Sequence, residues 1–221
     1  MNLINEIILA LTDSRIQIQD TLLKIKVLAA KINNKDLINF VNGELEGYEG
    51  KIPDYRIYKG QIIGNCTNGH MNYPSMSLPT AHLEPKTYKD LTSCEFYQSI
   101  GTLNEYLNIN EEKITKTIPI EYHSKLSKGL GNGYKVYSAW VPIDKGVISG
   151  VLTKIRSKLL DLMVEIEQSF SEEIIEQLFI KPDEPTKKAA NKIVNNYIKN
   201  IFTSSNDSKQ NVKIEQGIHN S

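Results

Sequence analysis

Apolar residues recur at three- and four-residue intervals in the first part of the chain and predict three helices. The first is a short amphipathic helix over residues 2–12, and a longer one follows the TDSR break and ends near Ile32. The third covers residues 35–46, with Asn34 as a good N-cap and Gly47 as a stop signal. Connections this short favour antiparallel neighbours, so the three helices predict an N-terminal helical layer.

The spacing of apolar residues changes after the third helix and predicts a strand. Pro53 disfavours a helical conformation at the residue before it, and residues 55–63 are rich in aromatic and β-branched side chains. Gly60 and Gly64, within or beside this stretch, predict a bulge or a close approach of backbone. Residues 65–85 contain three prolines and are expected to form a loop.

The next segments mix helical and extended patterns. A helix is expected over residues 86–107, although Gly101 weakens it, while residues 113–126 fit a strand or a helix equally well. The glycines of KGLGNGYK predict a turn into a strand over residues 134–143, which is expected to pair with the strand after Tyr55.

The longest helical stripe covers residues 147–166 and is predicted to be the central core helix. A short helix is expected over residues 171–179, and a last helix ends near residue 202. Residues 203–221 are polar enough to be disordered, apart from the partly alternating apolar residues Val212, Ile214 and Ile218.

These elements together predict an α+β, mainly helical fold. It consists of an N-terminal three-helix layer, a small antiparallel sheet, and a long C-terminal core helix with a helical extension. We expect residues 1–170 to form one domain, residues 171–202 to form the extension, and residues 203–221 to form the polar tail.

Composition narrows the class of protein. Lys plus Arg and Asp plus Glu both number 26, so the formal net charge is +0, and a nucleic acid is an unlikely partner unless a local basic patch exists. The 2 cysteines are too few for a secreted disulfide framework, and no run of about 18 apolar residues could span a membrane. We therefore expect a reduced, cytoplasmic protein without a membrane span.

Candidate metal and catalytic motifs are weak. Cys66, His70, His82 and Cys94 carry donor atoms that suit zinc, but only the first two are close together, whereas zinc sites usually use two tight pairs. The KGLGNGYK segment lacks the Gly-Lys-Ser or Gly-Lys-Thr ending of a phosphate loop, and no G-x-S-x-G nucleophile elbow occurs. The sequence therefore predicts no catalytic residue, no metal site and no cofactor.

A basic amphipathic helix precedes the tail. Lys188 and Lys192 supply charge on it, and Tyr197 and Phe202 supply aromatic rings. This pattern fits a solvated face above a packed face, or a helix that docks on a nucleic acid, a membrane surface or a protein. Because the net charge does not support a polyanion site, a protein partner is the preferred functional interpretation.

The stretch NKDLINFVNGELEGYEGKIPDYRIYKGQIIG resembles the AbiTii domain of bacterial abortive-infection proteins. It has an aromatic residue, Phe40, in the helix, an Asn-Glu-Leu-x-Gly-Tyr-like turn at residues 43–48, and a Leu-Pro-x-Tyr-Arg-like strand entry at residues 52–56. Gly43 departs from the pattern, where Asn is common. The segments LLKIKVLAAKI and VLTKIRSKLLDLMVEIE are also similar, so the resemblance extends to about residue 170.

This resemblance implies phage defence by cell death or growth arrest, beside a second protein encoded nearby, and it implies no established catalytic residues. The polar and aromatic residues of the stretch admit two interpretations. In one, Arg56 pairs with Glu44 or Asp54, the tyrosines pack over the helix end and Pro53 sets the entry angle. In the other, the same residues line a recognition surface. The residues concerned are Glu44, Tyr48, Pro53, Asp54, Tyr55 and Arg56.

We therefore expect an antiphage abortive-infection protein that acts as an interaction or effector module, together with a second defence protein or a phage or host protein. The alternatives are a nucleic-acid-processing, nuclease-like toxin and a regulator of a neighbouring toxin. Catalysis is not the preferred interpretation. If residues 212–218 add as a strand to another chain, the protein would form a homo-oligomer.

Overall fold

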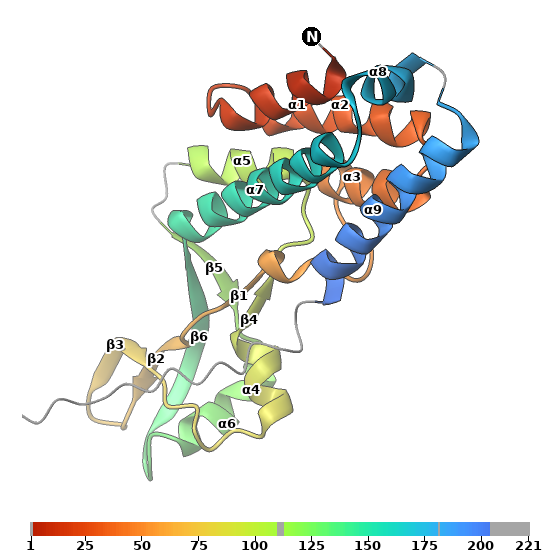
Figure 1. Ribbon diagram of the computed structural model, residues 1–221. Helices are drawn as coiled ribbons and strands as arrows, with labels where there is room; N and C mark the ends of the chain where they lie inside the picture. The colour runs from red at the N-terminus through yellow and green to blue at the C-terminus, as the bar shows by residue number, and fades with distance from the viewer. Residues whose placement is uncertain (1, 110–112, 181, 204–221) are drawn as a thin grey trace, which may run out of the picture.

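The computed structural model describes residues 2–109, 113–180 and 182–203, and its helices gather in a layer above a smaller part that contains the sheets (Figure 1). The helices of the layer are α1 (Leu3–Thr12), α2 (Ile18–Lys31), α3 (Lys35–Glu46), α5 (Ile100–Asn108), α7 (Lys145–Ser169), α8 (Glu172–Ile180) and α9 (Glu184–Thr203).

The strands and the shorter helices lie below this layer. The strands are β1 (Ile57–Lys59), β2 (Ile63–Thr67), β3 (Asn72–Ser77), β4 (Ser93–Glu95), β5 (Lys113–Thr117) and β6 (Lys135–Asp144). The shorter helices are α4 (Pro85–Thr92) and α6 (His123–Lys128), with the 3-10 turns η1 (Asp54–Arg56) and η2 (Ile120–Tyr122). This arrangement confirms the predicted α+β, mainly helical class.

The sheet part consists of two antiparallel sheets. The larger has the strand order β3-β2-β6-β5, and the smaller pairs β1 with β4. Ile63 of β2 lies opposite Trp140 of β6, so the expected pairing of these two segments is confirmed. The register shifts between Asn65 and Cys66, which confirms the bulge expected near Gly64.

The strand predicted over residues 55–63 is interrupted at Gly60. The Gly60 N–H donates to the carbonyl of Thr92, which keeps β1 beside β4, whereas the chain beyond Ile62 joins the larger sheet. A Cβ atom at Gly60 would lie 2.3 Å from Cγ1 of Val141, so only glycine allows this close approach.

Two further predicted elements were wrong. The helix expected over residues 86–107 ends at Thr92, because Ser93–Glu95 pairs with β1 and Ser99 caps a new helix through its contact with Thr102 N–H. The loop expected over residues 65–85 contains β3, where Pro74 is accommodated because β3 is an edge strand that bonds on one side only.

The ambiguous segment 113–126 contains both types of structure. It begins as β5, and η2 and then α6 follow Pro119, whose extended backbone (φ −58°, ψ 144°) ends the strand. No helix in the described parts of the chain has the length and apolar character that a membrane crossing requires.

The long helix α7 organises the core, as predicted. It packs against α1, α5 and α9, and its side chains Ile148, Ile155 and Leu159 are fully buried. Residues of α8 and α9, including Leu178 and Val194, belong to the same hydrophobic cluster. The C-terminal helices therefore share one core with the N-terminal layer.

Candidate functional site

The helix-to-strand corner at the end of α3 contains two buried charged side chains, Glu44 and Arg56. The helix begins where Asn34 Oδ1 accepts a hydrogen bond from Leu37 N–H at 2.8 Å. It ends at Gly47, whose φ of 101° suits glycine, and where any Cβ would lie 3.0 Å from the Tyr97 carbonyl oxygen. The corner is thus pressed against the segment that connects β4 to α5.

A fully buried ion pair lies under this corner. Arg56 Nη2 donates to Glu44 Oε2 at 2.6 Å and Arg56 Nε donates to Glu44 Oε1 at 3.2 Å, and neither side chain is exposed. The two bonds form a bidentate fork, the strongest geometry for an arginine and a carboxylate. Burial by itself would lower the pKa of the Arg56 guanidinium, but the hydrogen bonds and charge of Glu44 outweigh it and the net shift is upward.

Two tyrosines complete the cluster around Glu44. The hydroxyls of Tyr48 and Tyr55 donate to Glu44 Oε1 at 2.7 and 2.8 Å. Burial, followed by the negative charge of Glu44, raises the pKa of both phenols well above the ordinary value. The Tyr48 ring also lies 5.0 Å from the Arg56 guanidinium carbon, a cation–π distance.

Arg56 ties a third segment to the cluster. Its Nη1 donates to the carbonyl oxygens of Phe96 at 2.8 Å and Gln98 at 2.7 Å. Sequence patterns gave no signal for these two partners, because a backbone acceptor is present at every residue. Glu44, Tyr48, Tyr55 and Arg56, with these two carbonyls, are called the buried clasp below.

The other two candidate corner residues lie beside the buried clasp. Pro53 is buried with an extended backbone (φ −61°, ψ 148°), and its carbonyl accepts from Arg56 N–H at 2.9 Å. Asp54 opens η1 and is partly exposed, and among the described residues its carboxylate makes no ion pair or side-chain hydrogen bond. Arg56 therefore pairs with Glu44 and not with Asp54.

The buried clasp holds three segments of the scaffold together. Every polar group of its ion pair is satisfied within the protein, and no solvent reaches either charged side chain. A catalytic or recognition residue needs contact with a substrate or partner, which these two side chains lack in this conformation. The buried clasp therefore joins α3, the start of β1 and the β4–α5 connection.

The predicted partner-binding helix, α9, is divided between surface and core. Lys188 and Lys192 are exposed to solvent. Tyr197 is half-buried, and its hydroxyl lies 3.4 Å from Asp161 Oδ2 of α7. The Phe202 ring packs edge-on against Phe40 at 6.3 Å and is near Tyr48. The aromatic rings thus hold α9 to the protein, and the lysines remain on its outer face.

An amide network also anchors α9. Asn34 Nδ2 donates to Oδ1 of Asn191 at 2.7 Å and to Oδ1 of Asn195 at 2.8 Å. Asn191 in turn donates to the Ile32 carbonyl at 3.0 Å. The N-cap residue of α3 therefore has a second function that its position in the sequence did not indicate.

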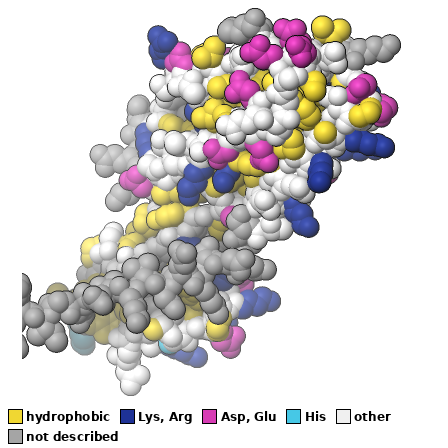
Figure 2. Space-filling view, in the orientation of Figure 1, with side chains coloured by type: hydrophobic (Ala, Val, Ile, Leu, Met, Phe, Trp, Pro, Cys, Tyr) yellow, Lys and Arg dark blue, Asp and Glu magenta, His cyan; other side chains and the backbone are white. Residues whose placement is uncertain are grey.

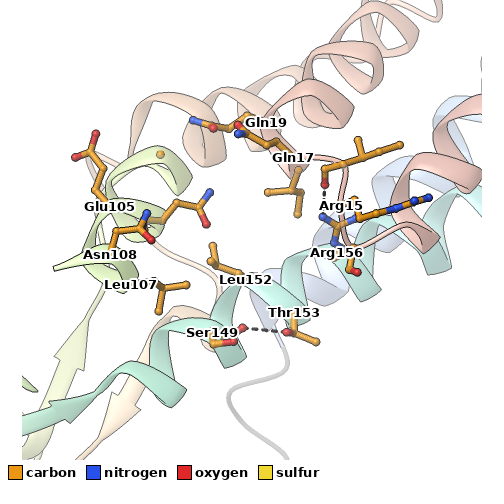
Figure 3. Close-up of a pocket in the computed structure, with 15 residues that line it drawn as sticks. Arg15, Gln17, Gln19, Glu105, Leu107, Asn108, Ser149, Leu152, Thr153 and Arg156 are labelled. Carbon is orange, nitrogen blue, oxygen red and sulfur yellow. Dashed lines mark hydrogen bonds between the residues drawn. The ribbon is translucent and has the colours of Figure 1, made fainter. Parts of the chain in front are cut away.

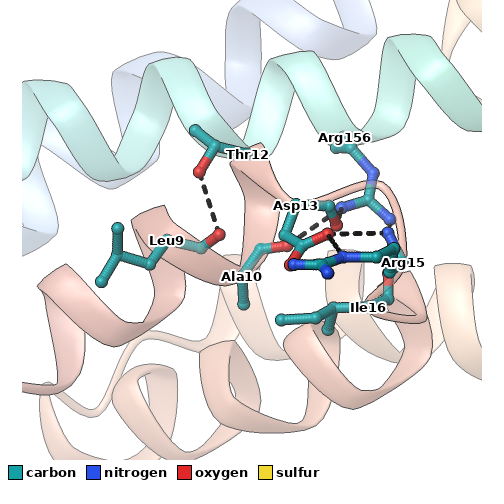
Figure 4. Close-up of polar contacts among 7 residues, drawn as sticks. All are labelled: Leu9, Ala10, Thr12, Asp13, Arg15, Ile16 and Arg156. Atoms are coloured by element: carbon teal, nitrogen blue, oxygen red, sulfur yellow. Dashed lines mark hydrogen bonds and ion pairs between the residues drawn. The ribbon is translucent and has the colours of Figure 1, made fainter.

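A second arginine, Arg156, makes polar contacts with the end of α1 and the α1–α2 loop (Figure 4). Arg156 of α7 donates to the carbonyl oxygens of Ala10, Leu11 and Asp13 through Nη1 and to that of Ile16 through Nη2, at 2.7 to 3.2 Å. The C-terminal carbonyls of a helix attract cations, so this contact stabilises the end of α1.

The pocket beside Arg156 measures about 560 Å³ and is lined mainly by polar side chains (Figure 3). Its polar lining includes Gln19, Asn104 and Asn108, and its apolar lining includes Leu107 and Leu152. Arg15 at its rim is paired with Asp13 at 2.7 Å, and this contact lowers the pKa of the Asp13 carboxyl. Patterns within one segment do not predict this pocket, because its lining comes from the α1–α2 loop, α2, α5 and α7.

The cysteines and histidines considered for zinc lie in separate places. Cys66 is buried in β2 and Cys94 in β4 of the other sheet, and burial raises the pKa of both thiols. His82 contacts the Lys125 carbonyl at 2.8 Å, and His70 lies in the β2–β3 turn. Within the described residues, no three His, Cys, Asp or Glu side chains come together as a metal site.

Comparison with known proteins identifies the family. Searches of curated proteins and of solved structures gave no match. The AbiTii family model matches residues 2–195, which is most of the chain and includes α8 and part of α9 beyond the expected limit near residue 170. The chain belongs to the AbiTii family, a bacterial abortive-infection family.

Proposed function

We propose that this AbiTii-family chain acts in the bacterial cytoplasm as an interaction module of an abortive-infection system, and that it binds a second defence protein or a phage or host protein. Family membership supports the role in phage defence. The observation that carries the interaction proposal is an apolar surface on the outside of the α1–α2 hairpin.

Three large apolar side chains of this hairpin are about half exposed. Leu9 of α1 is 55% exposed, and Leu23 and Val27 of α2 are 53% and 50% exposed. Leu23 and Val27 are one helical turn apart and so share a face. Leu9 and Ile16 line a shallow groove on the same hairpin, together with Lys24 of α2. An apolar helical face bordered by charged residues is typical of protein–protein contacts.

The enclosure of the Arg56–Glu44 ion pair is a second observation that supports an interaction module. Four of the candidate residues in the family-like stretch, Glu44, Tyr48, Tyr55 and Arg56, are hydrogen-bonded to one another, so they stabilise the scaffold. On the α1–α2 hairpin, the large apolar side chains Leu9, Leu23 and Val27 remain available to another molecule. A protein partner with an apolar helical face fits this surface better than a small polar substrate does.

A plaque assay tests this function. Phages are plated on a host that carries the chain with its neighbouring gene, and Leu23→Ser with Val27→Ser is expected to abolish protection while the protein level is unchanged. The matched control is Ile120→Ser in η2, because Ile120 is 77% exposed but lies in the sheet part. Full protection by the hairpin variant would exclude this surface, and no protection by the unaltered chain across a broad phage panel would exclude the defence role.

A nucleic-acid-processing toxin is the second candidate, and the lysines on the outer face of α9 favour it. Lys188, Lys192 and Lys199 are all exposed and follow one side of the helix. Salt-dependent binding of single-stranded DNA or RNA, lost when these lysines are replaced by Glu, would support this candidate. Protection from phage that persists in the triple Glu variant would count against it.

A further inference from the structure

The pocket beside Arg156 contains amide side chains with free hydrogen-bonding capacity. Gln19 of α2 and Asn104 of α5 line it, and within the described parts of the chain their side chains take part in no hydrogen bond. Asn108 donates through Nδ2 to the Asn104 carbonyl oxygen at 3.2 Å, and its Oδ1 accepts no hydrogen bond from a described residue. A free amide offers a donor and an acceptor side by side. This set therefore suits an uncharged group that also carries both.

The amides come together because α5 carries a glycine where α2 begins. A Cβ atom at Gly101 would lie 2.6 Å from Nε2 of Gln19, so glycine lets the Gln19 amide lie against α5. Asn104 and Asn108 follow at three and seven residues from Gly101, on the same face of α5. Gln19 and Asn104 are partly buried, and Asn108 is exposed at the outer end of the row.

Positive charge lies at the other end of the pocket. Figure 3 shows Glu105 and Asn108 at one end and Arg15 and Arg156 at the other. Arg156 donates to carbonyl oxygens, and it forms no ion pair with any described carboxylate. The carboxylate of Asp13 is already paired with Arg15 at 2.7 Å. The two guanidinium groups thus bring one more charge than this carboxylate balances, and this end suits an anion.

The backbone at the same end also favours an anion. Helix α2 begins at Ile18, which lines the pocket, and Gln17 before it makes no side-chain cap hydrogen bond. The first N–H groups of an uncapped helix are free donors at the positive end of the helix dipole. They add to the charge of Arg156 and suit the oxygens of a phosphate group.

The two ends are about one mononucleotide apart. Helix α7 lines the pocket from Ser149 to Arg156, which is about 10 Å along the helix axis. Lys145 Nζ donates to the Leu107 carbonyl oxygen at 3.0 Å, so the start of α7 lies beside the end of α5. A pocket volume of about 560 Å³ is typical of sites that hold small molecules.

We propose that this pocket binds an adenine mononucleotide. Adenine presents the N6 donor next to the N7 acceptor, which an Asn or Gln amide matches, so the amides of α2 and α5 hold the base. The base packs against Leu107 and Leu152, and the phosphate lies at the Arg156 end. Guanine presents two acceptors on the corresponding edge and needs Arg or Lys there, whereas the described charged side chain at the amide end is Glu105.

The proposal goes beyond the interaction module and does not use the exposed apolar side chains of the α1–α2 hairpin. The tail beyond Thr203, with the strand expected over residues 212–218, lies outside the described residues and has no part in it. Binding is measured on the purified full-length chain, so the result does not depend on whether the chain protects a host from phage.

Calorimetric titration with four probes tests the two ends of the pocket separately. AMP is expected to bind about tenfold more tightly than GMP, because the amides match adenine. AMP is also expected to bind about tenfold more tightly than adenosine, because only AMP brings a phosphate to Arg156. Inorganic phosphate alone should bind more weakly than AMP, because it makes no contact with the amides.

A variant connects this binding to the pocket. Asn104→Ala removes one amide from α5 and is expected to weaken AMP binding about tenfold, while the affinity for inorganic phosphate is unchanged. The matched control is Asn72→Ala, because Asn72 is exposed on β3 in the sheet part. Urea denaturation of both variants checks that the fold is retained.

Several outcomes would overturn the proposal. No binding of AMP at millimolar concentration would reject the site. Equal affinities for AMP and GMP would reject recognition of adenine, and equal affinities for AMP and adenosine would reject the phosphate end. An unchanged AMP affinity in Asn104→Ala would place the ligand elsewhere. A single-stranded adenylate RNA that binds more tightly than AMP would show that the ligand is a nucleic acid and not a free nucleotide.

Discussion

Arg56 and Arg156 perform similar tasks in opposite environments. Each guanidinium holds together backbone segments that are far apart in the sequence. Arg56 is fully buried and is neutralised by Glu44, whereas Arg156 is partly exposed and receives its support from carbonyl dipoles at the end of α1. The difference shows that a buried arginine needs a carboxylate partner, while an arginine near solvent does not.

The largest expected effect is the removal of the carboxylate from the buried clasp. Glu44→Ala leaves a buried guanidinium and two partly buried phenol hydroxyls without their acceptor. We expect the free energy of unfolding to fall by about 3–5 kcal/mol, measured by urea denaturation. Glu46→Ala is the control, because Glu46 is on the same helix but is exposed, 3.8 Å from Lys26. An exposed ion pair contributes up to about 1 kcal/mol to stability. A loss below this value would show that the buried pair of Arg56 is worth no more than an exposed pair, and the contrast with Arg156 would fail.

The next effect tests the arginine that lacks a carboxylate. Arg156→Met keeps much of the side-chain volume but removes the donors to four carbonyls, two in the last turn of α1 and two in the α1–α2 loop. We expect a loss of about 2 kcal/mol, because most of these carbonyls can be hydrated after the change. Hydrogen exchange should locate the change at the C-terminus of α1. A loss as large as that of Glu44→Ala would contradict the comparison.

Alkaline pH provides a smaller and graded test of the buried clasp. The pKa values of Tyr48 and Tyr55 are raised, mainly by burial and then by the charge of Glu44. At a pH above about 10 the unfolded chain loses phenol protons that the folded protein retains, so stability declines as pH rises. Tyr55→Phe should make this decline less steep in urea denaturation between pH 9 and 11. Identical slopes in the two proteins would indicate that Tyr55 titrates normally in the folded state.

The smallest expected effect concerns the exposed pair near Arg156. Arg15→Ala removes the partner of Asp13, but the Arg15 side chain is 88% exposed and solvent screens the pair. The urea midpoint should not change measurably. The pKa of Asp13, which the Arg15 contact lowers, should rise toward its ordinary value in an NMR titration. A clear loss of stability would show that the loop depends on this pair as well as on Arg156.

Local patterns were sufficient for most helices. The spacing of apolar residues located α1, α2, α3, α7 and α9, because each helix presents one stripe to a shared core. Local patterns failed at residues 86–107, where the helical spacing of apolar residues continued through Ser93–Glu95, which pairs with β1 as strand β4. Strand pairing depends on a distant partner, here β1, and the spacing within a segment does not contain that information.

The candidate site shows the same division. The residue types in the AbiTii-like stretch were sufficient to suggest that Arg56 pairs with a nearby carboxylate, and left Glu44 and Asp54 as alternatives. The tertiary structure selects Glu44, because the last turn of α3 directs it inward while Asp54 lies at the start of η1. The tyrosine hydroxyls and the carbonyls of Phe96 and Gln98 then satisfy the remaining polar groups.

The sequence by itself determined most of the helices, the corner between α3 and β1, the α+β class and the resemblance to a family, because these depend on the order and spacing of neighbouring residues. Only the tertiary structure decided that the Arg56–Glu44 ion pair is enclosed, that the Phe202 ring of α9 packs on Phe40, and that β5 is an outer strand of the larger sheet. The physical reason is that burial and free hydrogen-bonding capacity depend on which distant segments come together.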